Sequence, residues 1–510
     1  MRCRHHPSAG GSCPGCPLLD RPYAEQLATK RARLVAALSR YPHLELPEPA
    51  EIVPAVRTEA YRHRLKLPVH VGRDHVSVGL YGAGHRVLDT PDCPVLAEPL
   101  RALLDGVTDA LAGARDVHSI DLRVSDATGE GMLVVACRGG QFPGGPRGAR
   151  ELRRRVPGLA SVAVSRADPE GKRVMGSAPE VLAGSRFVEE RVGHTSYRLH
   201  PGAFFQVDPR QAVAIHTLVR DGVGEARRVL DLYAGVGAYG LMLAPGRERV
   251  LLVEEVPQAA EAARQVAPDN VEVLASKVEA VALKGRWDAA VLNPARRGSD
   301  PATLRTVAGL VERLVYVSCG PETLARDLDA LAAFGMRVQR IVPVDLFPQT
   351  PEVETVVTLV RGPSLATFPV KGGRARGPWT DGPSGAAGRP KVLQALVIGP
   401  VRPRGKLQVG TFERLGLVAG HALLRITLTG GTAARALGEL KAWGHPVAGQ
   451  DPRTAPFFAE KAGLLRPFVH VERDDRGAQA PLHGDLAEAI ERLGGLGSAE
   501  KPRHRGKRRR

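Results

Sequence analysis

The spacing of hydrophobic and polar positions changes twice along the chain. Between Tyr23 and Ser39, Leu27, Leu34 and Leu38 recur near the spacing of a helix. From Arg62, apolar and polar residues alternate as in half-buried strands, in the segments RLKLPVHVG, HVSVGLYG, DLRVSD and MLVVAC. From Arg228, short apolar runs are separated by helix-like stretches; these runs are RVLDLY, RVLLVE, WDAAVLN and LVYVSC. The alternating region from Arg62 predicts an antiparallel-rich sheet. The region from Arg228 predicts a doubly wound, mostly parallel α/β sheet.

These changes divide the 510 residues into segments. At roughly 150 residues per domain, the length corresponds to three or four folding units. The predicted segments are a cysteine-bearing segment over 1–50, a β-rich middle domain over 51–200, the α/β domain over 201–362, a linker rich in Gly, Pro and Arg over 363–392, a small α+β extension over 393–497 and a basic tail over 498–510.

The charge of the chain is strongly positive and unevenly placed. Of the net +17, residues 363–510 carry +13, and the chain ends in KPRHRGKRRR. Such a balance indicates a polyanionic partner, most often RNA or DNA, although a basic end can also be a solubilising tail. No apolar run approaches the roughly 18 residues of a membrane helix, and the opening MRCRHHP is no secretory signal. We therefore expect a cytoplasmic protein, without a membrane span, that binds nucleic acid.

A glycine-rich turn follows the first apolar run of the α/β domain, in the segment Val229 to Gly240. Gly235 and Gly237 allow a ligand to approach the backbone at the carboxyl edge of the sheet. The next run ends at Glu254, where an acid can accept hydrogen bonds from ribose hydroxyls. The spacing does not fit the G-x-G-x-x-G pattern of dinucleotide sites. It resembles the first motif of S-adenosylmethionine (SAM) methyltransferases, with Glu254 as the second.

A cysteine lies just beyond a later strand of the same domain. Cys319 follows LVYVS, and a helix is predicted to begin after Pro321. A helix N-terminus lowers the pKa of a thiol and favours the thiolate, so Cys319 is a candidate nucleophile. A buried structural cysteine is the alternative, since free cysteine is among the most buried residue types.

Four segments together resemble the RNA (uracil-5-)-methyltransferase family over about residues 1–361. They are PGAFFQV at 201–207, NPARRG at 293–298, LVYVSCGPETLARD at 314–327 and DLFPQTPEVE at 345–354. The resemblance implies a SAM-methyltransferase (Rossmann-like) sheet, an RNA-contacting middle domain and methylation of C5 of a uridine. It also implies Cys319 as nucleophile, Glu354 as the base that removes the C5 proton, and SAM contacts from Gln206, Tyr233, Gly235, Gly237, Glu254 and Asn293.

Three positions depart from this family. Asn293 replaces the usual Asp, Ala238 the usual Asn, and Glu352 the usual His. An Asn-Pro pair at 293–294 is also typical of amino-group methyltransferases, which is one alternative, although Cys319 and Glu354 would then have no role. A catalytically inactive RNA-binding or ribosome-assembly protein is the other alternative.

Four of the remaining cysteines form a candidate metal site. Cys13 and Cys16 make a C-x-x-C motif, and Cys3 and Cys93 complete a set of four. Four thiolates suit either zinc or a [4Fe–4S] cluster, and the neighbouring His5 and His6 slightly favour zinc. One branch of the family carries such cysteines for an iron–sulfur cluster, so the resemblance favours iron–sulfur and rRNA over tRNA as substrate. Cys137, in LVVAC, is predicted to be a core residue.

The basic extension resembles a different family. GHPVAGQ and the T-G-G-T turn at 429–432 are similar to the end of large-subunit pseudouridine synthases. The H-R-L-D segment with the catalytic Asp of that family does not occur after residue 363. We therefore predict a degenerate RNA-binding module, with a packing appendage as the alternative.

Overall fold

The computed structural model describes two parts of the chain. The first is 2–361 except 42–43, 45, 73–74, 115, 169, 171–174 and 284; the second comprises 390–397, 402, 404–418, 421–429, 433–443, 445, 447–448, 469–474 and 490–492. The predicted tail over 498–510 and all of the predicted linker except its last three residues lie outside the described residues.

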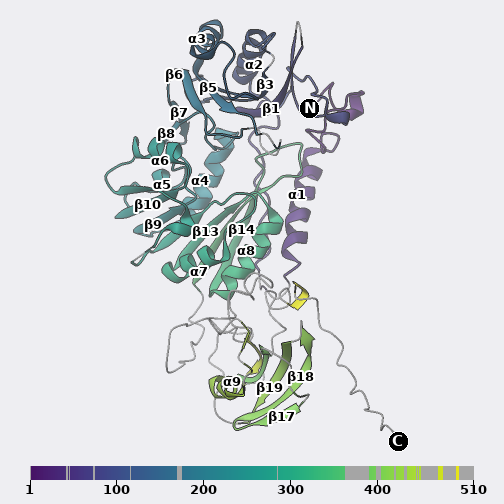
Figure 1. Cartoon of the computed structure of the whole chain (residues 1–510), viewed down its shortest axis with the longest axis vertical. Coiled ribbons are helices and arrows are strands. Elements are labelled where there is room, and N and C mark those ends of the chain that lie inside the picture. The colour runs from purple at the N-terminus through teal and green to yellow at the C-terminus, as the bar shows by residue number, and fades with distance from the viewer. Residues whose placement is uncertain are drawn as a thin grey trace, which may run out of the picture.

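A seven-stranded sheet with the order β11-β10-β9-β12-β13-β15-β14 forms the centre of the α/β part (Figure 1). Its strands are β9 (Arg228–Leu232), β10 (Arg249–Glu254), β11 (Val271–Ala275), β12 (Ala289–Leu292), β13 (Arg313–Ser318), β14 (Met336–Val344) and β15 (Glu354–Arg361). The first five strands in the order pair in parallel, whereas β15 is antiparallel to both of its neighbours. The order reverses between β9 and β12, which is where open α/β sheets bind ligands at their carboxyl edge.

Helices cover both faces of this sheet. They are α1 (Tyr23–Leu38), α4 (Pro209–Val223), α5 (Gly240–Leu243), α6 (Pro257–Arg264), η3 (Val278–Ala280), α7 (Pro301–Leu310) and α8 (Pro321–Ala333). Successive strand residues point to opposite faces, so Val229 joins the core beneath α4 and α6, and Leu230 joins the core beneath α1, α7 and α8. The expected doubly wound α/β sheet is present, with an antiparallel strand pair added at one side.

The helix predicted from Tyr23 is present as α1 and ends at Leu38, one residue before the expected end. It packs against α8, and Leu34 and Leu38 belong to the core of the seven-stranded sheet. The side chain of Lys30 is fully buried, and its Nζ lies 2.5 Å from Asp345 Oδ1. The N-terminal segment is therefore tied into the α/β domain.

A second, six-stranded sheet with the order β2-β1-β3-β4-β5-β6 occupies the middle of the chain. Its strands and their neighbouring elements are β1 (Arg64–Val71), β2 (Val76–Val78), η2 (Ala83–His85), α2 (Glu98–Ala110), β3 (Val117–Val124), β4 (Gly131–Cys137), α3 (Gly145–Arg155), β5 (Leu159–Arg166), β6 (Glu180–Gly184) and the hairpin β7 (Val188–Val192) and β8 (Thr195–Leu199). The expected antiparallel pairing holds except between β4 and β5, which are parallel because α3 connects them as a crossover helix. Cys137 is fully buried in this core, as predicted.

The remaining described elements are a short turn near the N-terminus and a five-stranded sheet near the C-terminus. They are η1 (Pro7–Ala9), β16 (Pro390–Val397), β17 (Arg404–Leu407), β18 (Gly410–Val418), β19 (His421–Leu428), α9 (Ala433–Ala442) and β20 (Val469–Asp474). Strand β16 begins at Pro390, inside the range predicted as linker. None of the described helices combines the length and the apolarity needed to cross a bilayer.

Candidate functional site

The glycine-rich turn after β9 adopts a left-handed backbone at three positions. Tyr233 has φ 62°, Gly235 has φ 57° and Gly237 has φ 83°. A Cβ on Gly237 would lie 2.8 Å from Leu241, whereas a Cβ on Gly235 would meet no atom within 4 Å. Gly237 is therefore required by packing, and Gly235 leaves space for a ligand beside the backbone. A non-glycine residue with positive φ, such as Tyr233, is typical of binding and active sites.

Two buried carboxylates hold this turn in place. Asp231 Oδ2 accepts a hydrogen bond of 2.6 Å from the Gly240 amide, and burial raises the pKa of Asp231 to about 7. At the end of β10, Glu254 accepts hydrogen bonds from the amides of Gly235 at 2.7 Å and Val256 at 2.8 Å. Burial also raises the pKa of Glu254, while these amides lower it. Glu254, the acid of the second methyltransferase motif, therefore faces the glycine-rich turn and also holds its backbone in place.

A narrow cleft lies beside the turn. Four of the six residues predicted to contact the cofactor line it: Gln206, Tyr233, Gly235 and Asn293. Gly237 and Glu254 support the same turn without lining the cleft. Phe204 also lines it and is 67% exposed, which is unusual for a phenylalanine and places an aromatic ring at its mouth.

The two predicted catalytic residues lie at the ends of neighbouring strands. Strand β13 ends at Ser318, strand β15 begins at Glu354, and Ser318 pairs with Thr355. Cys319 and Glu354, which are 35 positions apart in the sequence, are thereby brought to the same edge of the sheet. Each is close enough to influence the other, because a charge on Glu354 raises the pKa of the Cys319 thiol. Glu354 also acts electrostatically on Tyr239, a residue that lines the cleft.

The expected low thiol pKa at Cys319 is wrong for the protein without ligands. Burial, followed by the charge of Glu354, raises the pKa of Cys319 above its ordinary value. Helix α8 does begin at Pro321, but its N-terminus is outweighed by desolvation and by the neighbouring carboxylate. Burial likewise raises the pKa of Glu354, which is 4% exposed, to about 8. Near pH 7 both groups therefore carry their protons.

Arg296 is the residue of this site that the sequence interpretation missed. Its charge lowers the pKa of both Cys319 and Glu354, and it donates a hydrogen bond toward the thiol. Arg296 lies in the NPARRG segment, three positions after Asn293. The segment was recognised, but two adjacent arginines gave no signal as to which one faces the thiol. The structure brings a thiol, a carboxylate and a guanidinium together.

Residues from distant segments hold the two loops that form the site. Lys30 donates to Asp345 and to the carbonyl oxygens of Phe347 and Glu352, and thereby holds the segment that leads to Glu354.

On the other side, Arg64 forms a two-bond pair with Asp121 at 2.8 and 2.6 Å and donates to the carbonyl of Ala203 at 2.6 Å. Arg123 donates to the carbonyl of Phe205 at 3.0 Å. The middle sheet therefore fixes the loop that carries Phe204 and Gln206.

The four N-terminal cysteines lie within electrostatic reach of one another. Burial, followed by the charges on Cys93, Cys13 and Cys3, raises the pKa of the Cys16 thiol to about 12. His5 Nε2 lies 2.5 Å from Asp92 Oδ1, which joins the first loop to the one carrying Cys93. Within the described part of the chain, no group of three or more His, Cys, Asp or Glu side chains is arranged to hold a metal ion.

Both nearby histidines already have partners. His5 contacts Asp92, and His6 Nδ1 lies 2.8 Å from the Ser8 hydroxyl and accepts a bond from the Ser8 amide at 3.2 Å. Each contact uses one ring nitrogen, so it does not exclude either histidine as a ligand through the other. The four thiols by themselves fit an iron–sulfur cluster or zinc.

Comparisons with known proteins agree on one class of enzyme. Residues 276–362 match a family model described as tRNA (Uracil-5-)-methyltransferase. An uncharacterized RNA methyltransferase of Geobacter sulfurreducens is 32% identical over 375 residues, which span 69% of this chain and 76% of the relative. One of Gloeobacter violaceus is 32% identical over 379 residues, 68% of this chain and 82% of the relative. The crystal structure of Pyrococcus abyssi tRNA (uracil-54, C5)-methyltransferase in complex with S-adenosyl-L-homocysteine superposes with a TM-score of 0.56 at 26% identity, covering 68% of this chain and 86% of that one.

Proposed function

The chain belongs to the RNA methyltransferases of the tRNA (uracil-5-)-methyltransferase family, and from this premise we propose that it methylates C5 of a uridine in RNA by covalent cysteine catalysis. One observation carries the proposal: Cys319, Glu354 and Arg296 are in mutual electrostatic contact at the sheet edge, and Glu354 reaches a residue of the neighbouring cleft. A thiol that served only the core would need neither a buried carboxylate nor a guanidinium beside it.

The chemistry explains why these groups are needed together. C5 of uracil is a poor nucleophile, and SAM supplies an electrophilic methyl group. The Cys319 thiolate adds to C6, forming an S–C6 bond and shifting the electron pair of the C5–C6 double bond toward C5 and O4. C5 takes the methyl group as its bond to the SAM sulfur breaks, which leaves S-adenosyl-L-homocysteine, and the Glu354 carboxylate then removes the C5 proton. The electrons of the broken C–H bond restore the double bond and release the thiolate.

Arg296 supports both anionic states in this scheme. Cys319 must lose its proton before it can add to C6, and Glu354 must be ionised before it can accept the C5 proton. Burial opposes both ionisations, and Arg296 favours both. We assign Arg296 the role of stabilising the negative charge that moves between the thiol, the ring and the carboxylate.

The cleft beside the turn suits SAM. Gly235 leaves open space next to the backbone, and Gln206, Tyr233 and Asn293 supply polar groups around it. Glu254 uses one lone pair of each oxygen for a backbone amide and has others for ribose hydroxyls. The relative from Pyrococcus abyssi, whose structure contains S-adenosyl-L-homocysteine, supports this assignment. Asn293, in place of an acid, keeps hydrogen bonding but removes a charge.

We further propose that Cys3, Cys13, Cys16 and Cys93 hold a [4Fe–4S] cluster, with zinc as the alternative. The electrostatic coupling of the four thiols supports this. The same cysteine set is the reason for preferring rRNA to tRNA as the substrate.

One experiment tests the activity and the RNA class together. Ribosomal and transfer RNA from a strain lacking the gene are incubated separately with the purified protein and SAM, and nucleosides are measured by mass spectrometry. We expect 5-methyluridine in the rRNA fraction. Methylated amino groups would favour the amino-methyltransferase alternative, and absence of any new methyl group would favour an inactive RNA-binding protein, which Asn293 and Ala238 suggest.

The covalent step has a test of its own. Glu354→Gln removes the base but leaves the thiol, so addition and methylation proceed while proton removal does not. A covalent protein–RNA adduct should accumulate and appear as a retarded band on denaturing gels. The double variant with Cys319→Ala is the control and should show no such band. An adduct-free Glu354→Gln protein would contradict the assigned role.

We propose that the extension binds RNA without modifying it. Its charge supports this, since residues 363–510 carry +13. A chain ending near Gly362 should bind RNA more weakly and with a shallower salt dependence, because each lost phosphate contact removes about 0.7–0.9 from the log–log slope. If truncation leaves the RNA affinity and its salt dependence unchanged, the extension does not bind RNA and only packs against the rest of the protein. Formation of pseudouridine by the full chain would contradict the absence of chemistry.

A further inference from the structure

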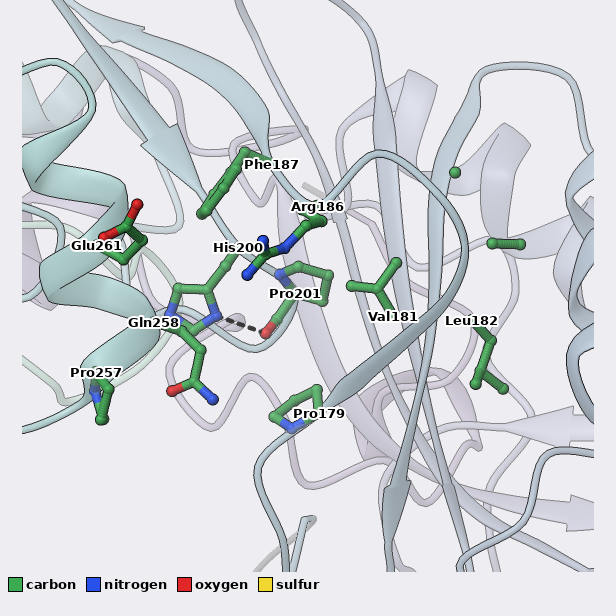
Figure 2. A pocket seen from close by; sticks show the side chains of 12 residues that line it. Pro179, Val181, Leu182, Arg186, Phe187, His200, Pro201, Pro257, Gln258 and Glu261 are labelled. Carbon is green, nitrogen blue, oxygen red and sulfur yellow. Dashed lines mark hydrogen bonds between the residues drawn. The ribbon is translucent and has the colours of Figure 1, made fainter.

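A cavity of about 560 Å³ lies between the edge strand β6, the turn into β7 and the start of α6. Figure 2 shows its walls, with Val181 and Leu182 of β6 on one side and His200, Gln258 and Glu261 on the other. None of the residues assigned above to methyl transfer or to SAM is among its described lining. The cavity and the methyl-transfer cleft share one loop, however, because His200 and Pro201 line the first and Phe204 to Gln206 line the second.

His200 lines this wall and carries a buried acceptor that has no partner among the described residues. The residue is 8% exposed, and its Nδ1 lies 2.8 Å from the carbonyl oxygen of Pro201, as the dashed line in Figure 2 marks. A carbonyl only accepts, so Nδ1 must carry a proton. Burial, assisted by the charges of Arg64 and Arg123, lowers the pKa of His200, so the ring is neutral near pH 7. Nε2 is then a bare acceptor, and it has no hydrogen-bond partner among the described residues.

The other walls of the cavity indicate which kind of ligand could donate a hydrogen bond to His200 Nε2. Phe187 lines the cavity while packing in part against the core, and the guanidinium of Arg186 lies 5.8 Å from its ring centroid. Arg153 approaches Gly184 of this wall, since a Cβ on Gly184 would lie 2.7 Å from its Nε, but that Nε donates to the Ala160 carbonyl at 3.2 Å and Arg153 does not line the cavity. A suitable occupant has a planar body, a hydrogen-bond donor and a negative charge. A nucleotide of RNA combines these three properties, because aromatic side chains stack bases and arginine binds phosphate.

We propose that this cavity is a second nucleotide subsite, which takes one nucleotide of the substrate RNA outside the methyl-transfer cleft. The proposal rests on the proposed function, since it presumes an RNA substrate. The base stacks on Phe187, Arg186 contacts the phosphate, and either an exocyclic amino group or the ribose 2′-hydroxyl donates to His200 Nε2. The Gln258 side chain, on the first turn of α6, moves aside to admit that donor. Occupation would fix the shared loop, and with it Phe204 and Gln206.

Direct binding of mononucleotides tests the subsite without any methylation. The full chain is saturated with S-adenosyl-L-homocysteine, and AMP, CMP, GMP, UMP and dAMP are titrated by calorimetry or NMR. If an amino group is the donor, UMP binds several-fold more weakly than AMP, because uracil has no exocyclic amino group. If the 2′-hydroxyl is the donor, dAMP is the weak ligand. Equal binding of all five nucleotides, or binding of none at millimolar concentration, would overturn the proposal.

Two variants locate the bound nucleotide. Phe187→Ala removes the stacking surface and should weaken AMP about tenfold, a typical loss for one base stack. Gln258→Trp fills the cavity and should abolish binding there. The two variants act in opposite ways, since Phe187→Ala removes a side chain from the cavity wall and Gln258→Trp adds one to the cavity. If one variant fails to fold, the other still tests the site. Tyr81→Ala, an aromatic that is 43% exposed elsewhere on the middle domain, is the matched control. AMP binding that both site variants leave intact would place the nucleotide elsewhere.

The same variants separate this inference from the proposed function. In the methylation assay, Phe187→Ala should raise KM for RNA about tenfold. It should leave kcat at saturating RNA, and SAM affinity measured without RNA, unchanged, since no reacting group is altered. An active enzyme whose KM is insensitive to Phe187→Ala and Gln258→Trp would overturn the subsite and leave the activity standing. If the protein has no methyltransferase activity but its mononucleotide binding is weakened by both variants, the subsite stands and the proposed function is overturned.

Discussion

The chain places thiols in two very different settings. Cys319 stands at the end of a central strand, and a register of hydrogen bonds between β13 and β15 fixes its distance from Glu354. Cys3, Cys13, Cys16 and Cys93 lie on loops, and their mutual positions depend on contacts such as the one between His5 and Asp92. The first setting surrounds one thiol with unlike groups that change its protonation. The second gathers like groups, whose charges repel until a cation binds them.

This difference teaches what each setting can do. A sheet edge holds different groups at constant separation, which a reaction that moves protons and electron pairs requires. Loops can adjust around a metal, and four adjacent thiolates gain stability only from the metal itself. We therefore expect changes at Cys319 to affect turnover alone, and changes in the cysteine group to affect metal content first.

The largest effect is expected from Cys319→Ala. Without the thiol no S–C6 bond forms, so kcat should fall at least about a hundredfold, while affinity for S-adenosyl-L-homocysteine changes only a few-fold. Single-turnover methylation and calorimetry measure the two quantities. Cys137→Ala is the control for loss of a buried thiol and should retain catalysis. A Cys319→Ala enzyme with more than a hundredth of the normal rate would contradict nucleophilic catalysis.

The loop cysteines should respond in metal content. The protein purified without oxygen should be brown, with absorbance near 400 nm and roughly four irons per chain. Cys93→Ser should lose the iron, and Cys137→Ser should keep it because Cys137 is buried in the core of the middle domain. Elemental analysis provides the measurement. Stoichiometric zinc without iron would decide for the alternative metal.

The stability of the domain that carries Cys319 and Glu354 should depend on the buried ion pair between Lys30 and Asp345. Lys30→Met leaves the Asp345 carboxylate buried without its cation, so the free energy of unfolding should fall by about 3–5 kcal/mol. Arg33→Met on the same helix breaks half-exposed pairs with Glu322 and Glu352 and should cost under about 1 kcal/mol. Urea denaturation compares the two variants. Equal losses of unfolding free energy would show that the buried Lys30 pair stabilises the fold no more than the half-exposed Arg33 pairs.

The smallest effect is a shift in pH dependence. Because burial raises the pKa of Glu354 to about 8 and raises that of Cys319 above its ordinary value, the rate of methyl transfer should rise with pH through about 8 and keep rising until the Cys319 thiol has ionised as well. The two groups titrate as a pair, so the rise belongs to both.

Arg296 provides the way to sharpen this prediction. Arg296→Gln should move the rise to higher pH, since Arg296 lowers the pKa of both groups. Arg297→Gln, its neighbour in the sequence, is the control. A rate that is independent of pH between 6.5 and 9 would contradict the assignment of these groups.

The sequence alone determined the elements and the chemical candidates. Apolar runs predicted the strand that ends at Glu254 and the strands that end just before Asn293 and Cys319, because local periodicity reports which residues are buried. It also predicted α1 and the buried position of Cys137. The resemblance to uracil-5 methyltransferases rested on short contiguous motifs, which a single sequence displays in full. The family comparison agrees with it over residues 276–362.

Only the tertiary structure decided how those candidates affect one another. Lys30 and Asp345 are separated by 315 positions, and Arg64 and Ala203 by 139, so no local pattern could pair them. The same holds for Arg296 and for the high pKa of Cys319, because desolvation depends on everything packed around a group and not on its neighbours in sequence. His200 is the clearest case. Its position after β8 can be read from the sequence, but its unsatisfied Nε2 exists only because β6, the turn into β7 and α6 are packed around it.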